Sequence, residues 1–322
     1  MRRLLFVKTS SLGDVVHNCP AVSDAARAWP EVAIDWVVEE AFADVAVMHA
    51  RVHRVIPVAV RRWRGALWSA RTWQEIGAFR RALRGERYDR VIDTQGLLKS
   101  ALLARAARGE RHGMDAASAR EPLAARFYDV RHPVTKGQHA VERNRQLVAA
   151  ALGVPPVAAC DYGLRAEGAQ PLEMPAPYAV LLTITSRADK LWPEEKWVEL
   201  GRRLATDGVR VVLPWGSDEE KARAERIASG VRDAVVPRRM RVAELARLLR
   251  TAKGVAGVDT GLTHLAAALG VPAVGIYTST QARLTGLHAG ARVRNLEGAD
   301  AAAVHAALAD ATAERAPLAG LA

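Results

Sequence analysis

One loop near the start of the sequence combines residue types that can hold or deprotonate a bound ligand. It reads Lys8-Thr9-Ser10-Ser11-Leu12-Gly13-Asp14 and lies between the apolar run Leu4-Leu5-Phe6-Val7 and the helix-like pattern Val15-Val16-His17. The order of strand, glycine-containing turn and helix puts such a loop at the carboxyl edge of a parallel sheet, where open α/β folds bind ligands. Asp14 then lies at a helix start, where a carboxylate either caps the helix by accepting backbone N–H bonds or faces the ligand. The residues alone leave both interpretations open.

Two loops in the second half have the composition of a phosphate or sugar site. Val258-Asp259-Thr260-Gly261-Leu262-Thr263-His264 repeats the order of strand, turn and helix, and a helix N-terminus beside a glycine suits a diphosphate. The segment 183–193 adds hydroxyls, an arginine and a lysine after another strand. Both loops also have plainer interpretations. Asp259 and Thr260 are typical helix N-caps, His264 can be a packed histidine, and the lysine-containing loop can be solvated surface.

A third loop and an arginine cluster complete the candidate binding groups. Pro214-Trp215-Gly216-Ser217-Asp218-Glu219-Glu220 follows a strand, and its glutamates either bond a ribose or favour a helix start. Arg61-Arg62-Trp63-Arg64, with Arg120 further on, can bind anions because guanidinium forks match phosphate and carboxylate oxygens. A solvated charged face is the alternative. The tryptophans at 63, 68 and 73 favour a boundary between water and an apolar phase, where exposed aromatics beside arginines are at home.

Alternating strands and helices must position these loops. Strand patterns cover residues 4–7, 32–38, 52–60, 88–93, 178–183, 209–213, 255–258 and 272–277. Helical patterns cover 71–85, 97–107, 138–152, 193–205, 218–227, 242–249, 261–269 and 299–313, and Gly153 suits a helix C-cap. Segment 109–136 has no clear period and is predicted to be a long loop. We therefore predict an α/β protein with mostly parallel sheets.

The prolines at 155, 156, 171, 175 and 177 divide the chain, because such a segment forms neither a long helix nor a central strand. The predicted domains are an N-terminal Rossmann-like domain over 1–155, a linker over 156–174 and a C-terminal Rossmann-like domain over 175–322. The two sheets are expected to face each other across a cleft, with a terminal helix able to pack back on the first domain. Neither half contains a G-x-G-x-x-G or P-loop motif, so dinucleotide redox and NTPase functions have no motif behind them.

Composition narrows the class of partner. The net charge of +11 is uneven: residues 1–155 hold 25 basic and 16 acidic residues, whereas residues 156–322 hold 21 and 19. The excess in the first half indicates an anionic partner there, such as a nucleic acid, a phospholipid surface or a phosphorylated substrate. No apolar run reaches the roughly 18 residues of a membrane span, and the two cysteines, Cys19 and Cys160, have no metal-ligand spacing. We expect a soluble, cytoplasmic chain.

Taken together, the motifs resemble the heptosyltransferase I family of lipopolysaccharide biosynthesis, in order from residue 1 to about 275. The segments that carry the resemblance are Lys8-Thr9-Ser10-Ser11-Leu12-Gly13-Asp14-Val15, Trp36-Val37-Val38-Glu39-Glu40, Arg61-Arg62-Trp63-Arg64, Asp93-Thr94-Gln95-Gly96-Leu97, Arg120-Glu121-Pro122-Leu123, Asp189-Lys190-Leu191-Trp192-Pro193-Glu194-Glu195 and Val258-Asp259-Thr260-Gly261-Leu262-Thr263-His264. The resemblance implies a GT-B glycosyltransferase that moves heptose from ADP-L-glycero-β-D-manno-heptose to the first Kdo of Kdo-lipid A. It also implies inversion at the anomeric centre, no metal and no cofactor.

The resemblance also assigns residues. Asp14 corresponds to the general base that takes the proton of the acceptor hydroxyl. The implied donor-binding residues are Thr185, Ser186, Lys190 at the phosphates, Glu220 at the ribose, Met240 near the adenine, Asp259, Thr260, Gly261 and His264. The implied acceptor-binding residues are Ser10, Gly13, Arg61, Arg62, Arg64 and Arg120. One departure stands out: Thr278-Ser279-Thr280 follows Tyr277, where the family often has Gly-Pro.

The residues agree with this chemistry, since an in-line displacement needs one base and charge compensation for the departing diphosphate. The partners implied are ADP-heptose, Kdo-lipid A and the inner leaflet of the inner membrane, on whose cytoplasmic face the protein would lie peripherally. Two alternatives remain. A heptosyltransferase of the same fold could act on a later core heptose, although the run of arginines favours the phosphorylated early acceptor. A nucleic-acid-binding protein could use the basic first half, although the sequence holds no recognised nucleic-acid module.

Overall fold

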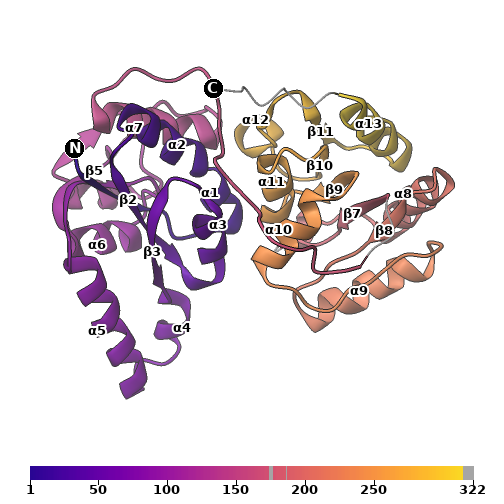
Figure 1. Ribbon diagram of the computed structural model, residues 1–322, viewed down its shortest axis with the longest axis horizontal. Helices are drawn as coiled ribbons and strands as arrows, with labels where there is room; N and C mark the ends of the chain where they lie inside the picture. Colours follow the sequence, from indigo (N-terminus) through magenta and orange to yellow (C-terminus); the bar gives the residue numbers. More distant parts are fainter. Residues whose placement is uncertain (174–176, 186, 315–322) are drawn as a thin grey trace. The chain divides into compact units, whose positions relative to one another are not determined.

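The computed structural model describes residues 1–173, 177–185 and 187–314, and divides into two compact units, Met1–Arg165 and Ala166–Ala322 (Figure 1). The division falls inside the predicted linker. Each unit has its own parallel sheet with helices against it, so each is described by itself. The α/β class and the two parallel sheets agree with the sequence-based prediction.

The first unit is built on a sheet with the strand order β3-β2-β1-β4-β5-β6, in which every neighbouring pair is parallel. Its strands are β1 (Arg3–Val7), β2 (Ala33–Glu39), β3 (Val52–Val58), β4 (Arg87–Asp93), β5 (Arg108–Met114) and β6 (Val130–His132). The chain winds outward from β1 to β3 and then restarts beyond β1 at β4. The order therefore reverses between β1 and β4, which makes this pair the switch point of the sheet.

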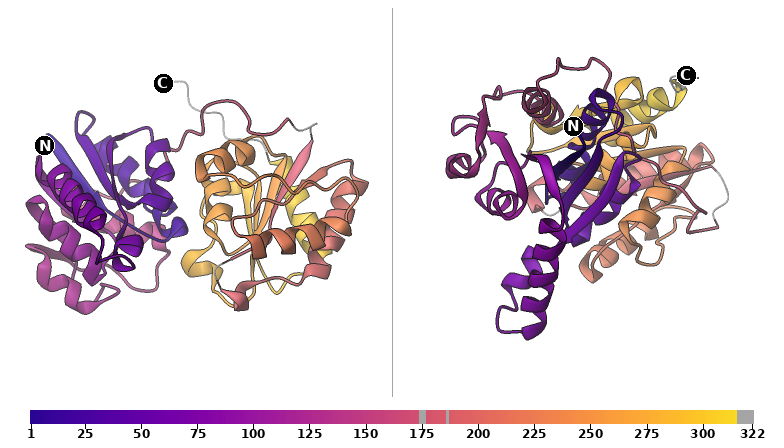
Figure 2. Two further views of the ribbon diagram at one scale, coloured as in Figure 1. Left: turned by 90° about the horizontal axis from the view of Figure 1, so that it is seen from below. Right: turned by 60° about the vertical axis from the view of Figure 1, so that its left-hand side comes forward.

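Helices cover both faces of this sheet (Figures 1 and 2). They are α1 (Leu12–Val16), α2 (Cys19–Ala28), α3 (Ala43–Met48), α4 (Val60–Arg64), α5 (Ala70–Arg84), α6 (Leu98–Ala106) and α7 (Ala140–Leu152). Alternate residues of β1 serve opposite faces, and Leu5 and Val7 join a buried cluster with Phe79 and Leu83 of α5. Gly153 ends α7 in the left-handed conformation, at φ 68°, as its predicted capping role requires.

The prediction of a long loop over 109–136 is wrong. This segment contains most of β5, the 3-10 helix η2 (Pro122–Phe127) and β6. β5 reads Arg-Gly-Glu-Arg-His-Gly-Met and is exposed or half-buried over its first four residues, so it lacks the apolar run of a central strand. β6 has only three residues. β5 pairs with β4 and β6 pairs with β5. This pairing comes from the tertiary fold and leaves no local periodicity to read.

The second unit repeats the architecture with the strand order β11-β10-β9-β7-β8, again parallel throughout its described pairs. Its strands are β7 (Tyr178–Leu182), β8 (Arg210–Val212), β9 (Gly254–Val258), β10 (Ala273–Tyr277) and β11 (Val293–Glu297). Its helices are α8 (Glu194–Thr206), α9 (Asp218–Ser229), α10 (Val242–Arg250), α11 (Gly261–Ala268), α12 (Ala282–Thr285) and α13 (Ala301–Ala313), and η3 (Ala188–Lys190) and η4 (Gly290–Arg292) are 3-10 turns. Here the switch point lies between β7 and β9.

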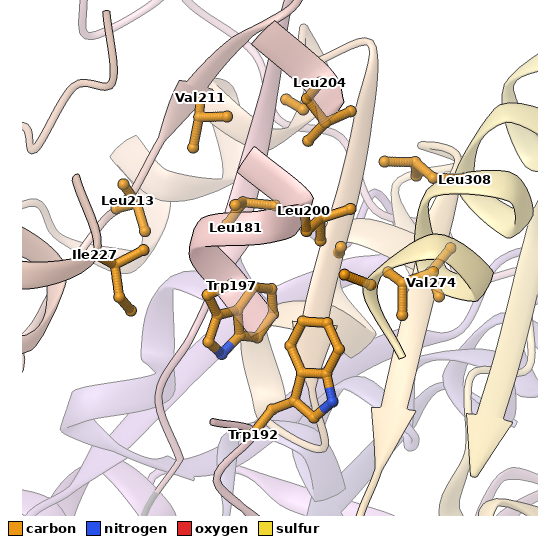
Figure 3. Close-up of a cluster of buried hydrophobic side chains, with 14 of the residues drawn as sticks. Leu181, Trp192, Trp197, Leu200, Leu204, Val211, Leu213, Ile227, Val274 and Leu308 are labelled. Atoms are coloured by element: carbon orange, nitrogen blue, oxygen red, sulfur yellow. The ribbon is translucent and has the colours of Figure 1, made fainter. Parts of the chain in front are cut away.

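The core of the second unit forms where α8, α9 and α13 pack on one face of the sheet. Figure 3 shows Leu200 and Leu204 of α8 among buried side chains of the strands and of α13. Trp192 and Trp197 meet edge to face, with ring centroids 4.8 Å apart. The terminal helix α13 packs on α8 and on the strands of this same unit. This core holds the strands of the second unit in place, and with them the loops that follow those strands.

Candidate active site

The loops that carry Asp14, Lys190 and Asp259 follow strands that flank the two switch points. In the first unit, the loop with Asp14 follows β1 and the segment Asp93–Gly96 follows the neighbouring strand β4. In the second unit, the loop with Lys190 follows β7 and Asp259 follows the neighbouring strand β9. Ligands of open α/β sheets bind outside the carboxyl ends of the strands at such points. Each unit therefore brings its chemically distinctive residues to the position where its own sheet is suited to bind a ligand.

Asp14 is the third residue of α1, and Ser11 is the N-cap. The Ser11 backbone N–H and hydroxyl both donate to Asp14 Oδ2, at 2.9 and 3.1 Å, and Arg120 lies 3.5 Å from Oδ1. Burial raises the pKa of Asp14, but the charge of Lys8, the Ser11 N–H and the charge of Arg120 outweigh it, so the pKa is lowered. The carboxylate thus accepts a backbone N–H at the helix start, as the capping interpretation predicted, and it is held ionised with its side chain 28% exposed.

Gln95 fixes the backbone that leads to Asp14. Its Oε1 accepts the N–H groups of Thr9 and Ser10 at 2.8 and 3.2 Å, and its amide donates to the Ser10 carbonyl. Ser10 itself is buried, and its hydroxyl accepts a hydrogen bond from Lys99 at 3.1 Å. The predicted acceptor residues Ser10 and Gly13 therefore lie in the same rigid turn as Asp14. Sequence reasoning assigned no role to Gln95 or Lys99, and their position after β4 was the available signal.

Lys8 is a buried cation beneath this turn. Its ammonium donates to the Thr94 carbonyl at 2.9 Å and to Asn144 Oδ1 at 3.5 Å. Burial is the main cause that lowers the pKa of Lys8, while the Asp14 carboxylate opposes the change. The two side chains stabilise each other's charged forms, which helps keep Asp14 a carboxylate in a partly desolvated place.

A buried chain of contacts supports Gln95 in turn. Asp93 accepts the Gln95 N–H at 2.8 Å and the Tyr128 hydroxyl at 2.7 Å. The Tyr128 ring lies against Gly113 so closely that a Cβ there would overlap the ring. Gly113 on β5 therefore makes room for the ring that anchors Asp93, which anchors Gln95 and the Asp14 turn.

The arginine cluster lies on α4 and its members differ in their surroundings. Arg62 is bonded to both oxygens of Glu40 at 3.0 Å and to Glu75 at 2.7 Å, so its charge is already compensated. Arg61 and Arg64 are exposed. The expectation that Trp63 is an exposed aromatic is wrong: it is buried, and its indole N–H donates to Glu75 at 2.8 Å. Trp63 anchors α4 to the domain because its ring also packs edge to face on Phe79.

In the second unit, Asp259 gathers several predicted donor residues. Lys190 donates to Asp259 Oδ2 at 2.6 Å, and His264 Nε2 lies 3.3 Å from Oδ1. Thr185 donates its hydroxyl to the Asp259 carbonyl at 3.2 Å, and Thr280 donates to Oδ2 at 2.9 Å. Burial raises the pKa of Asp259, but the bonds from His264 and Lys190 outweigh it and the pKa lies well below its ordinary value. Thr280 belongs to the segment that departs from the family pattern, and sequence reasoning did not include it in the site.

The helix after β9 begins at Gly261, with Thr260 as its N-cap residue. Thr260 forms no side-chain cap bond, and the Asp259 side chain is directed to Lys190 and His264 instead. The capping interpretation of these two side chains therefore does not hold. The N-terminal N–H groups of α11 lie beside the lysine, an arrangement that suits a bound diphosphate.

The remaining predicted donor residues are placed differently. Glu220 accepts the N–H groups of Gly216 and Ser217 at 2.6 and 3.1 Å, so it forms the capping box of α9 after β8. Met240 is buried just before α10. Ser186 lies outside the described residues. Among the residues that the structure describes, no group of three His, Cys, Asp or Glu side chains is arranged to hold a metal ion.

Comparison with known proteins identifies the family. Residues 76–305 match glycosyltransferase family 9 (heptosyltransferase). The chain is 50% identical to lipopolysaccharide heptosyltransferase 1 of Escherichia coli K12 over 287 residues. The aligned region covers 88% of this chain and 90% of that protein. This chain belongs to glycosyltransferase family 9. Two solved structures show that the similarity of this family 9 chain to its relatives includes the fold.

The solved structure of E. coli heptosyltransferase WaaC with ADP superposes on this family 9 chain with a TM-score of 0.89, at 46% identity, over 96% of this chain and 99% of that one. WaaC with ADP-2-deoxy-2-fluoro heptose gives 0.82 at 47% identity, over 91% and 92%. The GT-B fold expected from the sequence is thus confirmed. Within the described part of this family 9 chain, no helix is long and apolar enough to cross a membrane.

Proposed function

We propose that this chain transfers L-glycero-D-manno-heptose from ADP-heptose to the first Kdo of Kdo-lipid A. The observation that carries the proposal is Asp14: an ionised carboxylate at the switch point of the first unit, in a chain half identical to a lipopolysaccharide heptosyltransferase 1. The reaction needs a base for the acceptor hydroxyl, and a partly exposed carboxylate with a rigid backbone behind it is suited to that task. Asp14 is therefore the proposed general base.

The donor is assigned to the second unit. Lys190 and the N-terminus of α11 flank the switch point there, and a diphosphate is stabilised by a fixed cation and by helix N–H groups. The E. coli relative has been solved with ADP and with an ADP-fluoroheptose, which supports an ADP-sugar as the ligand of these residues. Thr185, Ser186, Asp259, Thr260, Gly261 and His264 are the further proposed donor contacts, with Glu220 at the ribose and Met240 at the adenine.

The proposed reaction is one displacement. The acceptor oxygen forms a bond to the anomeric carbon while the bond from that carbon to the diphosphate breaks, so the configuration inverts. The hydroxyl proton passes to Asp14, and the electron pair of the broken bond leaves with ADP. Lys190 and the N–H groups of α11 compensate the charge of the leaving diphosphate. Fixed charges of this kind can replace a metal ion, so we propose a metal-independent mechanism without a cofactor.

The acceptor is assigned to the first unit, which carries most of the excess positive charge. Ser10 and Gly13 lie in the Asp14 turn, and Arg120 lies beside its carboxylate. All three arginines of α4 are exposed; Arg61 and Arg64 are proposed as direct acceptor contacts, and Arg62, which pairs with Glu40 and Glu75, belongs to the same cluster. Because this acceptor is a lipid, we propose that the protein works peripherally on the cytoplasmic face of the inner membrane.

A transfer assay tests the proposal. Purified protein is incubated with ADP-heptose and either Kdo-lipid A or a core that already carries heptose, with and without EDTA. The expected result is transfer to Kdo-lipid A in both conditions, with the opposite anomeric configuration to that of the donor in the NMR spectrum of the product. Transfer only to the heptose-bearing core would replace the first Kdo by a later core heptose as the acceptor. Loss of transfer with EDTA would contradict metal independence.

A further inference from the structure

The connection between α4 and α5 exposes large apolar side chains to solvent. We call residues 64–73 the α4–α5 tip. Within it, Leu67, Trp68 and Trp73 are 50%, 85% and 59% exposed. Figure 2, right, shows α4 and the start of α5 projecting from the rest of the first unit. Exposed single hydrophobics are ordinary, but three within seven residues at a projecting turn indicate contact with an apolar phase.

The tip is held in this position by its base. Trp63, the last residue before the tip, is buried and its indole N–H donates to Glu75 of α5. At the tip, the Trp73 indole N–H donates to the Leu67 carbonyl at 2.8 Å, which satisfies a backbone acceptor of the turn. The tryptophans of one hairpin therefore divide into an internal anchor and an external apolar surface. None of the contacts among the described residues explains why Trp68 is exposed.

The charges around the tip indicate what kind of surface it contacts. Four arginines lie in or beside the tip, at 61, 62, 64 and 71, and the one acidic residue of the hairpin, Glu75, pairs with Arg62 and Arg71. A large apolar tip within an arginine-rich hairpin matches an anionic lipid surface, because the indoles partition to the headgroup level while arginines pair with lipid phosphates. A protein partner of acidic composition would match the arginines but leave Trp68 without an apolar environment.

We propose that the α4–α5 tip inserts into the interfacial layer of an anionic bilayer, with Leu67 and Trp68 as the inserting side chains. The inference rests on the proposed function only for the identity of the membrane, since it names the surface that would bring the acceptor-binding arginines of α4 to the headgroups. The inserting side chains differ from the groups assigned to the acceptor: Leu67 and Trp68 present an apolar surface to the lipid, whereas Asp14 and Arg120 handle the sugar.

Vesicle sedimentation tests this proposal. The full chain is mixed with phosphatidylcholine vesicles with and without phosphatidylglycerol, as wild type, as Trp68→Ser, and as Leu102→Ser, a control that removes a half-exposed apolar side chain from α6. We expect binding to the anionic vesicles that weakens with salt, a loss of about tenfold for Trp68→Ser, and no loss for Leu102→Ser. Equal binding of wild type and Trp68→Ser would overturn the proposal, as would equal losses in the two variants.

A second readout separates this inference from the proposed function. Heptose transfer is compared on vesicle-embedded Kdo-lipid A and on its fully deacylated, water-soluble counterpart. Trp68→Ser is expected to lose transfer to the embedded acceptor and to retain wild-type transfer to the soluble one. Equal losses on both acceptors would place Trp68 in the sugar site and contradict the proposal. A wild type that binds vesicles through Trp68 but transfers no heptose would refute the proposed function and leave the membrane surface standing.

Discussion

Removing one hydroxyl from the donor cluster should weaken the handling of the donor. Thr280→Val keeps the shape of the side chain but deletes the donor that bonds Asp259 Oδ2 at 2.9 Å. Lys190 bonds the same oxygen at 2.6 Å, so the two donors share one acceptor atom. Without Thr280, the carboxylate draws more tightly on Lys190, and the lysine is less available to a diphosphate. Thr280 is thus expected to act as a positioning residue.

The size of the effect follows from the contacts that remain. A hydrogen bond to a charged group contributes about 1.5–3 kcal/mol, and Asp259 keeps Lys190 and His264 as partners, so we take the lower end of that range. This corresponds to about a tenfold loss in kcat/KM for ADP-heptose and in the affinity for ADP measured by calorimetry. The pKa of Asp259 should rise with the lost donor but stay below neutral, because the lysine and the histidine still hold its charge.

A matched control makes the reasoning refutable. Thr278→Val removes a neighbouring hydroxyl that bonds the Asp189 carbonyl and does not contact the Asp259 carboxylate. It should leave both constants near the wild-type values. Unchanged constants in Thr280→Val would refute a positioning role. Equal losses in both variants would instead attribute the effect to the loop as a whole.

Four further predictions follow from the two sites. Asp14→Asn should lower kcat by about 10²–10⁴-fold while ADP-heptose affinity by calorimetry is kept, and substantial turnover would remove Asp14 as the base. Lys190→Ala should raise the donor KM and lower kcat by about 10²-fold or more, and unchanged constants would place it outside the site. Arg120→Gln removes a charge that lowers the pKa of Asp14, so the acidic limb of the kcat/KM profile should move to higher pH; a shift to lower pH would contradict the assigned contact. Gly113→Ala should lower the unfolding free energy in urea titration by about 1–3 kcal/mol, because the Tyr128 ring must move; an unchanged midpoint would show that the ring yields freely.

The strands that could be predicted are those with a local apolar pattern. Leu4–Val7 and Tyr178–Leu182 are short apolar runs that end in turn residues, and both were found as strands. β5 and β6 were missed because a polar strand of seven residues and one of three carry no such pattern. β5 pairs with β4 and β6 pairs with β5, and Tyr128 packs where Gly113 leaves room. Contacts of that kind have no signature in a window of neighbouring residues.

The candidate site was predictable to the extent that it consists of loops after strands. Asp14 and Asp259 were found because each follows an apolar run and precedes a helix. That Gln95 supports the turn depends on a contact between residues 85 apart in sequence, from the segment after β4 to the Ser10 N–H. The more distant partners of Asp259 come from two other loops, after β7 and after β10, which only the strand order brings together. The positions of these residues at the ends of strands were therefore predictable, whereas their supporting contacts were not.

The division at Arg165 and Ala166 has an evolutionary consequence. Each unit has its own hydrophobic core and its own switch point, where its candidate site residues lie. Under the proposed function, a substitution in the first unit can alter the choice of acceptor without changing the residues that bind the nucleotide. A substitution in the second unit can likewise alter donor binding without changing the residues that bind the acceptor. Related enzymes can in this way diverge in the acceptor they use while they keep the same activated sugar as donor.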